Sequence, residues 1–236
     1  MSGKDKVMPE GKWQFDQDVA NVFDDMLQRS IPNYYEMRAL VNALSLEYAR
    51  TGTTVVDLGC SHGETIADIY RVAGDTVRYV GVEISKPMIE RARKRFMEGY
   101  PTVDICEMDL RHEYPFAERA GLTLSVLTLM FIPIEYRLNV LQTVRDNLAS
   151  DGAFILVEKV LGEGSIIDRM MVRQYLKMKR DNGYTEDQIE RKRLSLEGVL
   201  VPVSAGYNVD MLKQVGFSHI DCFWRSLNFC GFIALP

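Results

Sequence analysis

The chain has 236 residues, 47% of them hydrophobic, which is enough for one α/β domain with an elaboration. Its net charge of −5 argues against the broad basic surface that grips nucleic acid, so no direct nucleic-acid binding is expected. No run approaches the roughly 18 apolar residues that a membrane span needs, and residues 1–13 lack the apolar core of a signal peptide, so we expect a cytoplasmic protein without membrane contact.

The amino-terminal part of the chain predicts two helices. Residues 1–12 are polar and expected to be mobile, and apolar residues then recur at helical spacing over 16–29 and 34–49. Pro32 separates the two helices, because the residue before a proline avoids the helical conformation. Residues 1–50 are therefore expected to form a helical extension in front of a main domain over 51–236.

From residue 51 onward, strand patterns alternate with helical patterns. Seven segments are rich in β-branched and apolar residues and predict strands: 53–58, 77–82, 103–107, 122–127, 153–157, 219–224 and 228–235. Helical patterns lie between most of them: 64–72, 85–99, 135–148 and 209–215. Such alternation predicts a mostly parallel sheet covered on both faces, with an antiparallel last strand. Residues 165–200 have helical patterns and no strand, which predicts a helical insertion at about 163–206.

The segment 55–63 (VVDLGCSHG) carries the clearest chemical signal. A buried strand ends in an acid, and a turn with Gly59 and Gly63, where the backbone can approach a ligand closely, then opens a helix. The pattern lacks the three glycines that bind a dinucleotide pyrophosphate. The carboxylate of Asp57 would repel a pyrophosphate but suits an amino group, which favours the methionine end of S-adenosylmethionine.

Two further acids follow the next two strands. Glu83 ends the second strand, where it can accept from both hydroxyls of a ribose. Asp109 follows the third strand and can accept from an adenine amino group, while the backbone of Leu110 can contact the ring edge. The alternative is that these acids only cap turns. Together the three acids predict an α/β fold of the Rossmann-like, class I methyltransferase type with S-adenosylmethionine as cofactor, and we expect no metal site.

Segments along nearly the whole chain resemble one family, the carboxy-S-adenosyl-L-methionine synthases. The matching stretches are 13–16 (WQFD), 22–26 (VFDDM), 28–34 (QRSIPNY), 57–61 (DLGCS), 88–91 (MIER), 158–159 (EK), 179–180 (KR), 182–184 (NGY), 192–193 (KR) with 197, 215–217 (VGF) and 227–229 (LNF). The amino-terminal and NGY stretches are not general features of methyltransferases, so the resemblance is fairly specific.

The resemblance implies an activity and an assembly. Members of the family convert S-adenosylmethionine and prephenate to carboxy-S-adenosylmethionine and phenylpyruvate, for the modification of a tRNA wobble uridine. A sulfonium ylide captures the carbon dioxide that prephenate releases. The members are homodimers, and the helical insertion meets the partner subunit. The cofactor of this chain is then S-adenosylmethionine or its carboxylated form.

The resemblance also implies roles for individual residues. Arg193 matches an arginine that holds the added carboxylate, which is reasonable because a buried carboxylate needs a cationic partner. Tyr34 is expected beside it, with Tyr35 in the core. Lys159, at the end of the fifth strand, can supply a second positive charge or merely pair with a neighbour. The candidate catalytic residues are Arg193, Tyr34 and Lys159. The candidate cofactor-binding residues are Tyr34, Asp57, Gly59, Cys60, Ser61, Glu83, Ile84, Asp109, Leu110, Val126 and Arg193.

Three positions depart from the family pattern. Val126 stands where an asparagine is expected, Glu83 stands where aspartate is usual, and His62 is expected to face solvent in the glycine turn. The departures leave two other functions open: methyl transfer to a small-molecule or macromolecular acceptor, from S-adenosylmethionine or its carboxylated form, and ligand binding without turnover. Apolar residues of the insertion form a stripe that suits a lid or a dimer interface: Ile166, Ile167, Met170, Met171, Tyr175 and Met178.

Overall fold

The computed structural model describes residues 4–115 and 119–236. Over these residues the strands are β1 (Thr54–Leu58), β2 (Arg78–Glu83), β3 (Val103–Glu107), β4 (Ala120–Val126), β5 (Leu148–Leu161), β6 (Val203–Ser204), β7 (His219–Ser226) and β8 (Phe229–Leu235). The α-helices are α1 (Gln17–Ser30), α2 (Tyr34–Leu46), α3 (Glu64–Ala73), α4 (Lys86–Arg95), α5 (Ile134–Asp146), α6 (Ser165–Asp181), α7 (Glu186–Leu196) and α8 (Ala205–Gln214).

One twisted sheet organises the chain, with strand order β3-β2-β1-β4-β5-β8-β7. Strands β1 to β5 run parallel, and β8 is antiparallel to both of its neighbours. The predicted α/β fold with a mostly parallel sheet is confirmed. The structure adds the two-residue strand β6, which pairs with the end of β5. Strand β5 is also longer than predicted, because its residues pair with β4 on one side and with β8 on the other.

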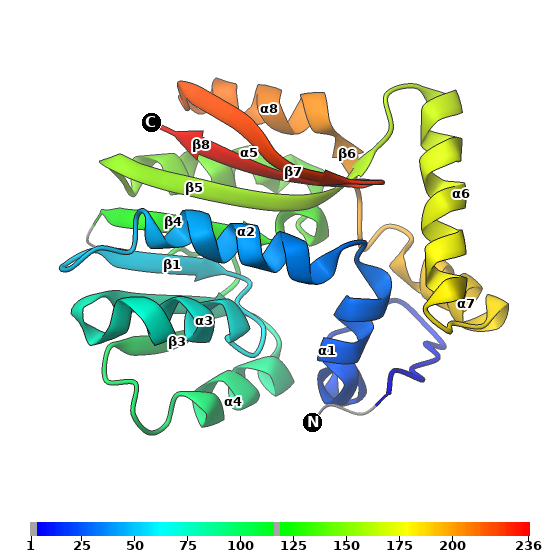
Figure 1. Cartoon of the computed structure of the whole chain (residues 1–236), viewed down its shortest axis with the longest axis horizontal. Coiled ribbons are helices and arrows are strands. Elements are labelled where there is room, and N and C mark those ends of the chain that lie inside the picture. Colours follow the sequence, from blue (N-terminus) through cyan, green and yellow to red (C-terminus); the bar gives the residue numbers. More distant parts are fainter. Residues whose placement is uncertain (1–3, 116–118) are drawn as a thin grey trace.

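Helices cover both faces of the sheet (Figure 1). Successive residues of β5 point to opposite faces: Phe154 and Leu156 belong to the apolar core under α5 and α8, whereas Ile155 and Val157 belong to the core under α2 and α3. All four side chains are at most 1% exposed. A strand that is buried on both faces has apolar residues at successive positions. Such continuous apolar runs are typical of parallel sheets, which is why the sequence indicated one.

The carboxyl ends of the parallel strands face α1, α6, α7 and the segment before α1 (Figure 1). The amino-terminal segment is fastened to this group of helices, because Asp5 is only 1% exposed and binds side chains of the insertion. The expectation of a mobile segment over 1–12 therefore does not hold at Asp5; residues 1–3 lie outside the described chain.

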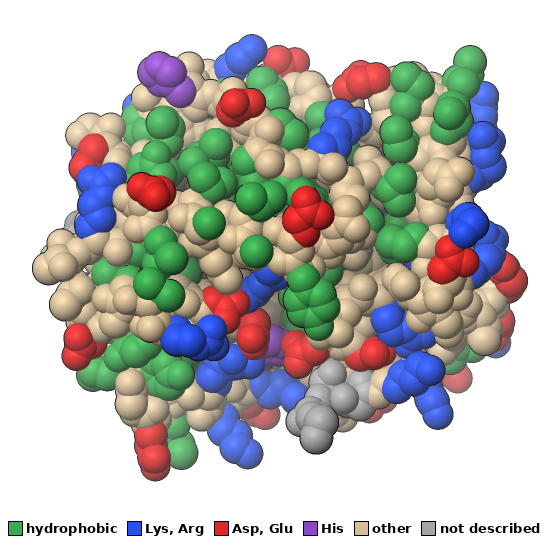
Figure 2. Space-filling model, viewed as in Figure 1, with side chains coloured by type: hydrophobic (Ala, Val, Ile, Leu, Met, Phe, Trp, Pro, Cys, Tyr) green, Lys and Arg blue, Asp and Glu red, His purple; other side chains and the backbone are tan. Residues whose placement is uncertain are grey.

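The predicted insertion forms two helices, α6 and α7. Helix α6 stands apart from the sheet, and hydrophobic side chains gather along it in Figure 2. Ile166, Ile167 and Met170 are 69%, 45% and 50% exposed, and Lys179 is the one residue of α6 that is buried. The first half of the predicted apolar stripe is thus exposed in the single chain, whereas Met171, Tyr175 and Met178 are partly buried.

Candidate active site

A pocket of about 520 Å³ opens where the parallel strands end. The crevice beyond the carboxyl ends of the strands is the usual ligand site of open α/β sheets. Of the predicted site residues, all but Arg193 line this pocket: Tyr34, Asp57, Gly59, Cys60, Ser61, Glu83, Ile84, Asp109, Leu110, Val126 and Lys159. The structure thus brings together residues from all parts of the chain between Tyr34 and Lys159.

The turn after β1 depends on its glycines. Gly59 has a φ of +74°, and a Cβ there would collide with the side chain of Thr128. Gly63 has a φ of +80° at the start of α3, where a Cβ would collide with the ring of Phe96. Both positions therefore combine a backbone conformation that favours glycine with a lack of space. The backbone of the turn stays close to the pocket as a result.

Asp57 lies at the bottom of the pocket and is only 2% exposed. Burial raises the pKa of its carboxyl to about 7, opposed by the nearby Arg38 guanidinium and reinforced by Glu83. A ligand ammonium group beside Asp57 would restore the charged form. Arg38 reaches the same pocket from α2, where Thr65 and Asp68 accept hydrogen bonds from its guanidinium.

Glu83 organises the loops around the pocket through backbone amides. Its Oε2 accepts from the amide of Ser61 at 3.0 Å, and its Oε1 accepts from the amides of Ile84 and Ser85 at 2.8 and 2.9 Å. The carboxylate is thus held between the turn after β1 and the start of α4. Because Oε1 accepts two amides and Oε2 accepts one, the carboxylate keeps one acceptor site, on Oε2, for a ribose hydroxyl.

Asp109 and Leu110 line the pocket beyond β3. The Asp109 carboxylate accepts from Nε of Arg111 at 2.9 and 3.0 Å and from the Arg111 amide at 3.0 Å. The hydrogen bond from Arg111 is the main reason why the pKa of Asp109 lies below its usual value. The predicted acceptor for an adenine amino group is therefore already bonded to Arg111.

Tyr34 lines the pocket at the start of α2, and burial raises the pKa of its hydroxyl to about 12. The prediction of Tyr35 in the core is wrong, because its side chain is 66% exposed. The two residues follow each other on a helix, so only one of them can face the pocket.

His62 is buried, in contrast to the prediction. It is 7% exposed, its Nε2 lies 2.7 Å from Oδ1 of Asp24, and its ring packs edge-on against Phe23. The hydrogen bond to His62 is the main cause that lowers the pKa of Asp24. The pair joins the glycine turn to α1, so the amino-terminal extension forms part of the site wall.

The other end of the pocket is basic. Lys159, Lys179 and Lys192 reach it from β5, α6 and α7. The Nζ atoms of Lys159 and Lys179 lie 4.8 and 5.6 Å from the ring centre of Tyr175, which also lines the pocket. Lys192 is ion-paired with Asp5. The pocket therefore has acids at the ends of β1 and β2 and cations beside α6 and α7.

Arg193 lies outside the pocket of its own chain. Its side chain is half exposed and forms ion pairs with Glu190 at 2.7 Å and with Glu197 at 2.5 Å. Its helical neighbour Lys192 points inward instead and is 3% exposed. On a helix two successive residues lie about 100° apart, so the run 191–193 could not reveal which cation faces the ligand.

Comparison with known proteins shows the family. A family model described as a methyltransferase domain matches residues 55–152. The chain is 38% identical over 225 residues to a carboxy-S-adenosyl-L-methionine synthase from Methylococcus capsulatus, a match that covers 94% of this chain and 92% of that protein. It is 39% identical over 230 residues to a protein of the same name from Wolinella succinogenes, a match that covers 94% and 93%. The chain belongs to the carboxy-S-adenosyl-L-methionine synthase family.

Membership of this family makes the chain an S-adenosylmethionine-dependent transferase, with S-adenosylmethionine as its cofactor. Among solved structures, an O-methyltransferase family protein from Burkholderia thailandensis is 16% identical, with a TM-score of 0.64 over 93% of this chain and 60% of that chain. This likeness confirms the class I methyltransferase fold. No helix among the described residues is long and apolar enough to span a membrane.

Several pocket residues escaped prediction from the sequence. Arg38 lies in a segment with the pattern of an ordinary amphipathic helix, and Lys179 and Lys192 lie in helical segments rich in polar residues, so none of the three stands out in the sequence. The only early signal was the resemblance of the stretches around Lys179 and Lys192 to the carboxy-S-adenosyl-L-methionine synthase family. Asp5 gave no signal, because its partner Lys192 is 187 residues away in the chain.

Proposed function

We propose that the protein converts S-adenosylmethionine and prephenate to carboxy-S-adenosylmethionine and phenylpyruvate. The observation that carries the proposal is a pocket with acids at the ends of β1 and β2 and cations from β5, α6 and α7, in a chain of this family. The first half suits the amino and ribose groups of S-adenosylmethionine, and the second suits an acidic second substrate. The product then serves the modification of a tRNA wobble uridine.

The acidic half of the pocket suggests how S-adenosylmethionine is oriented. Asp57 binds the ammonium group, Glu83 binds the ribose hydroxyls, and the backbone of Leu110 contacts the adenine edge. Arg38, which the pocket adds to the predicted set, is placed to bind the methionine carboxylate. The sulfonium methyl then points toward the basic half, between Val126 and Lys159.

The reaction needs no general base from the protein. Prephenate loses carbon dioxide and its ring hydroxyl, which leaves phenylpyruvate. The hydroxyl takes a proton from the sulfonium methyl and departs as water. The methyl carbon then forms a bond to the carbon dioxide, so the carboxyl group lost by one substrate appears on the other. The pocket's task is to hold both substrates together while excluding water.

The identity of the product tests this function. Purified protein is incubated with S-adenosylmethionine and prephenate, and the small molecules are analysed by mass spectrometry. We expect a nucleoside heavier than S-adenosylmethionine by one carbon dioxide, together with phenylpyruvate.

Ordinary methyl transfer, the second candidate, is favoured by the apolar Val126 in the pocket wall. S-adenosylhomocysteine with a methylated acceptor would establish that candidate instead.

We also propose that the chain forms a homodimer in which Arg193 enters the pocket of the partner subunit. The exposed apolar residues of α6, with Leu194 at 48% exposure beside Arg193, suit a contact between copies. An arginine supplied across the interface explains how a residue outside its own pocket can hold the added carboxylate.

Complementation between two inactive variants tests the placement of Arg193. Arg193→Ala and Asp57→Asn subunits are co-expressed in equal amounts, and the unsorted dimers are assayed at a concentration of S-adenosylmethionine too low to occupy the Asp57→Asn site. If Arg193 acts across the interface, each mixed dimer has one intact site, so random mixing restores about a quarter of wild-type activity. No recovery is expected if Arg193 acts within its own chain, and that result would remove the proposal.

A further inference from the structure

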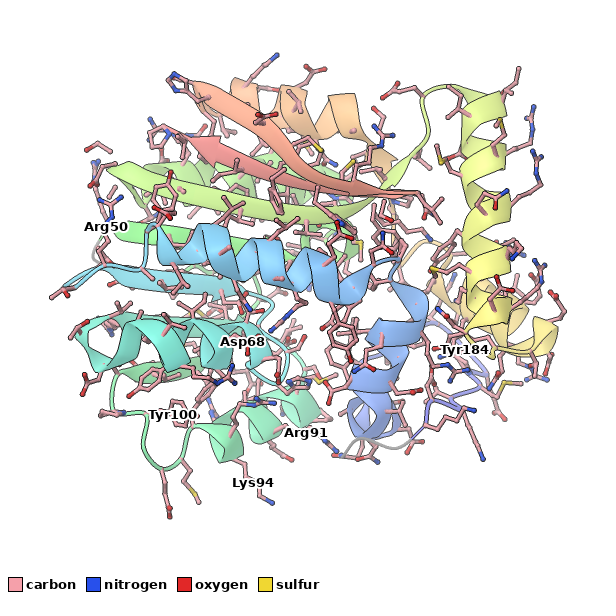
Figure 3. The ribbon with its side chains drawn as sticks, in the orientation of Figure 1. Arg50, Asp68, Arg91, Lys94, Tyr100 and Tyr184 are labelled. Carbon is pink, nitrogen blue, oxygen red and sulfur yellow. The ribbon has the colours of Figure 1, made fainter. Side chains whose placement is uncertain are left out.

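The basic end of the pocket has a particular construction. We call Lys159, Lys179 and Lys192 the lysine row. The ring of Tyr175 lies between the first two, and the ring of Tyr184 lies between the last two, 5.0 Å from Nζ of Lys179 and 4.9 Å from Nζ of Lys192. Figure 3 shows Tyr184 where α1 and the base of the insertion meet. The row therefore combines three cations from three separate elements.

The charges of the lysine row are not balanced within the chain. Asp5 accepts from Lys192 and from the hydroxyl of Tyr184, so one carboxylate neutralises one lysine. Lys179 is only 6% exposed, yet within residues 4–115 and 119–236 it has neither a hydrogen-bond acceptor nor an ion-pair partner. Lys159 has no ion pair among these residues either, although Asp168 lies near enough to favour its charged form. Two positive charges thus remain at the pocket.

Burying an ammonium group without a partner costs folding free energy, so a buried unpaired lysine indicates a role other than stability. Burial is the main cause that lowers the pKa of Lys179 to about 8, with further contributions from the charges of Lys192 and Lys159. Lys179 is also the one buried residue of the 17-residue helix α6, which otherwise meets the apolar core through the partly buried Tyr175. A purely structural position there would favour an apolar side chain.

We propose that the lysine row is the subsite for the second substrate and selects a dianion with two carboxylates. This assignment rests on the proposed function. Two unbalanced cations match two carboxylates, and Trp13, Tyr175 and Phe229 line the same end of the pocket, where they can cover an unsaturated ring. Lys179 is the residue that distinguishes a dianion from a monoanion, because it has no carboxylate of its own.

Asp5 is a positioning residue in this arrangement. Its carboxylate holds Lys192 and Tyr184, and its backbone carbonyl accepts from Arg29 of α1 at 3.1 Å. It therefore neutralises one lysine and keeps α7 against α1. Without Asp5 a third unbalanced charge would face the pocket.

Binding is measured with prephenate as the probe, by calorimetry on protein saturated with S-adenosylhomocysteine, so that no reaction occurs. Lys179→Met is expected to raise the Kd for prephenate by roughly 10- to 150-fold, since hydrogen bonds to charged groups contribute about 1.5–3 kcal/mol. The Kd for S-adenosylmethionine should stay within about twofold of wild type, because Lys179 lies away from the acidic half. Lys177→Met, on the exposed side of the same helix, is the matched control and should change neither value.

Phenylpyruvate has a single carboxylate, so its Kd is measured beside that of prephenate. The ratio of the two Kd values shows whether the subsite prefers a dianion over a monoanion. The preference of wild type for prephenate over phenylpyruvate should shrink in Lys179→Met and return in Lys179→Arg. The groups that face Lys179 are Lys159, Lys192, Asp5, Arg29, Tyr175 and Tyr184. Because burial lowers the pKa of Lys179 to about 8, prephenate affinity should fall between pH 7 and pH 9 in wild type and less in Lys179→Met.

The outcomes separate the two proposals. If wild type binds neither prephenate nor phenylpyruvate, the proposed function fails. If wild type binds prephenate but Lys179→Met binds it equally well, the lysine row is not the subsite, whatever the function. An equal loss of S-adenosylmethionine binding would also overturn the assignment. Lys159→Met at the other end of the row is expected to act in the same direction, which keeps the test decisive if Lys179→Met does not fold.

Discussion

Asp57→Asn is expected to raise the Kd for S-adenosylmethionine by roughly 10- to 150-fold, since a hydrogen bond between charged groups contributes about 1.5–3 kcal/mol. Asp57 is buried at the end of β1 and lines the acidic half of the pocket. Asparagine has nearly the same shape but cannot neutralise the ligand ammonium. Isothermal titration calorimetry measures the change, and Asp104→Asn on the exposed edge of β3 serves as the control. Equal affinities in Asp57→Asn and wild type would show that the ammonium binds elsewhere.

The same substitution should change stability in the opposite direction. Burial raises the pKa of Asp57 from 3.8 to about 7 in the folded chain. The folded state therefore holds a proton more tightly than the unfolded state, and stability is lost as pH rises through 7. Between pH 5 and pH 8 the loss from this one group is on the order of 2 kcal/mol.

Urea unfolding of the ligand-free protein tests this expectation. The free energy of unfolding of wild type should fall between pH 5 and pH 8 by more than that of Asp57→Asn, and the variant should be the more stable protein at pH 8. Parallel pH profiles for the two proteins would contradict the raised pKa. Affinity and stability thus compete at this position, as is common for groups that serve a ligand.

Glu83→Ala is expected to weaken S-adenosylmethionine binding by a similar factor, roughly 10- to 150-fold. The alanine removes the proposed ribose acceptor and also leaves the amides of Ser61, Ile84 and Ser85 without their carboxylate. The melting temperature should fall as well, because each unsatisfied amide carries a cost of about 1 kcal/mol or more if water does not reach it.

Two further variants define the role of Glu83. Glu107→Ala is the matched control, since Glu107 pairs in register with Glu83 at the end of the neighbouring strand but is exposed. Glu83→Asp keeps the charge with a shorter side chain, so it should recover part of the affinity. If Glu83→Ala lowered the melting temperature but not the affinity, the carboxylate would be a loop cap only.

The sequence determined the sheet and the acidic half of the pocket. Apolar runs of strand length, separated by helical patterns, required a parallel sheet with both faces covered, and β1 to β5 follow from that pattern. An acid at the end of each of two neighbouring strands must face the same edge of the sheet, because parallel strands end together. The sequence therefore predicted that Asp57 and Glu83 share one edge of the sheet, and both line the pocket there.

Only the tertiary structure decided the basic half. The apolar stripe of α6 is partly exposed and α7 has few apolar residues, so neither local pattern indicates that Lys179 and Lys192 face the pocket. His62 became buried because Asp24 of α1 meets it, and Tyr35 remained exposed because Tyr34 already occupies the pocket side of α2. The position of Asp5 depends on a partner 187 residues away. Contacts between segments that are distant in the chain produce no periodic pattern of residues in the sequence. These contacts form only when α1, α6 and α7 pack together.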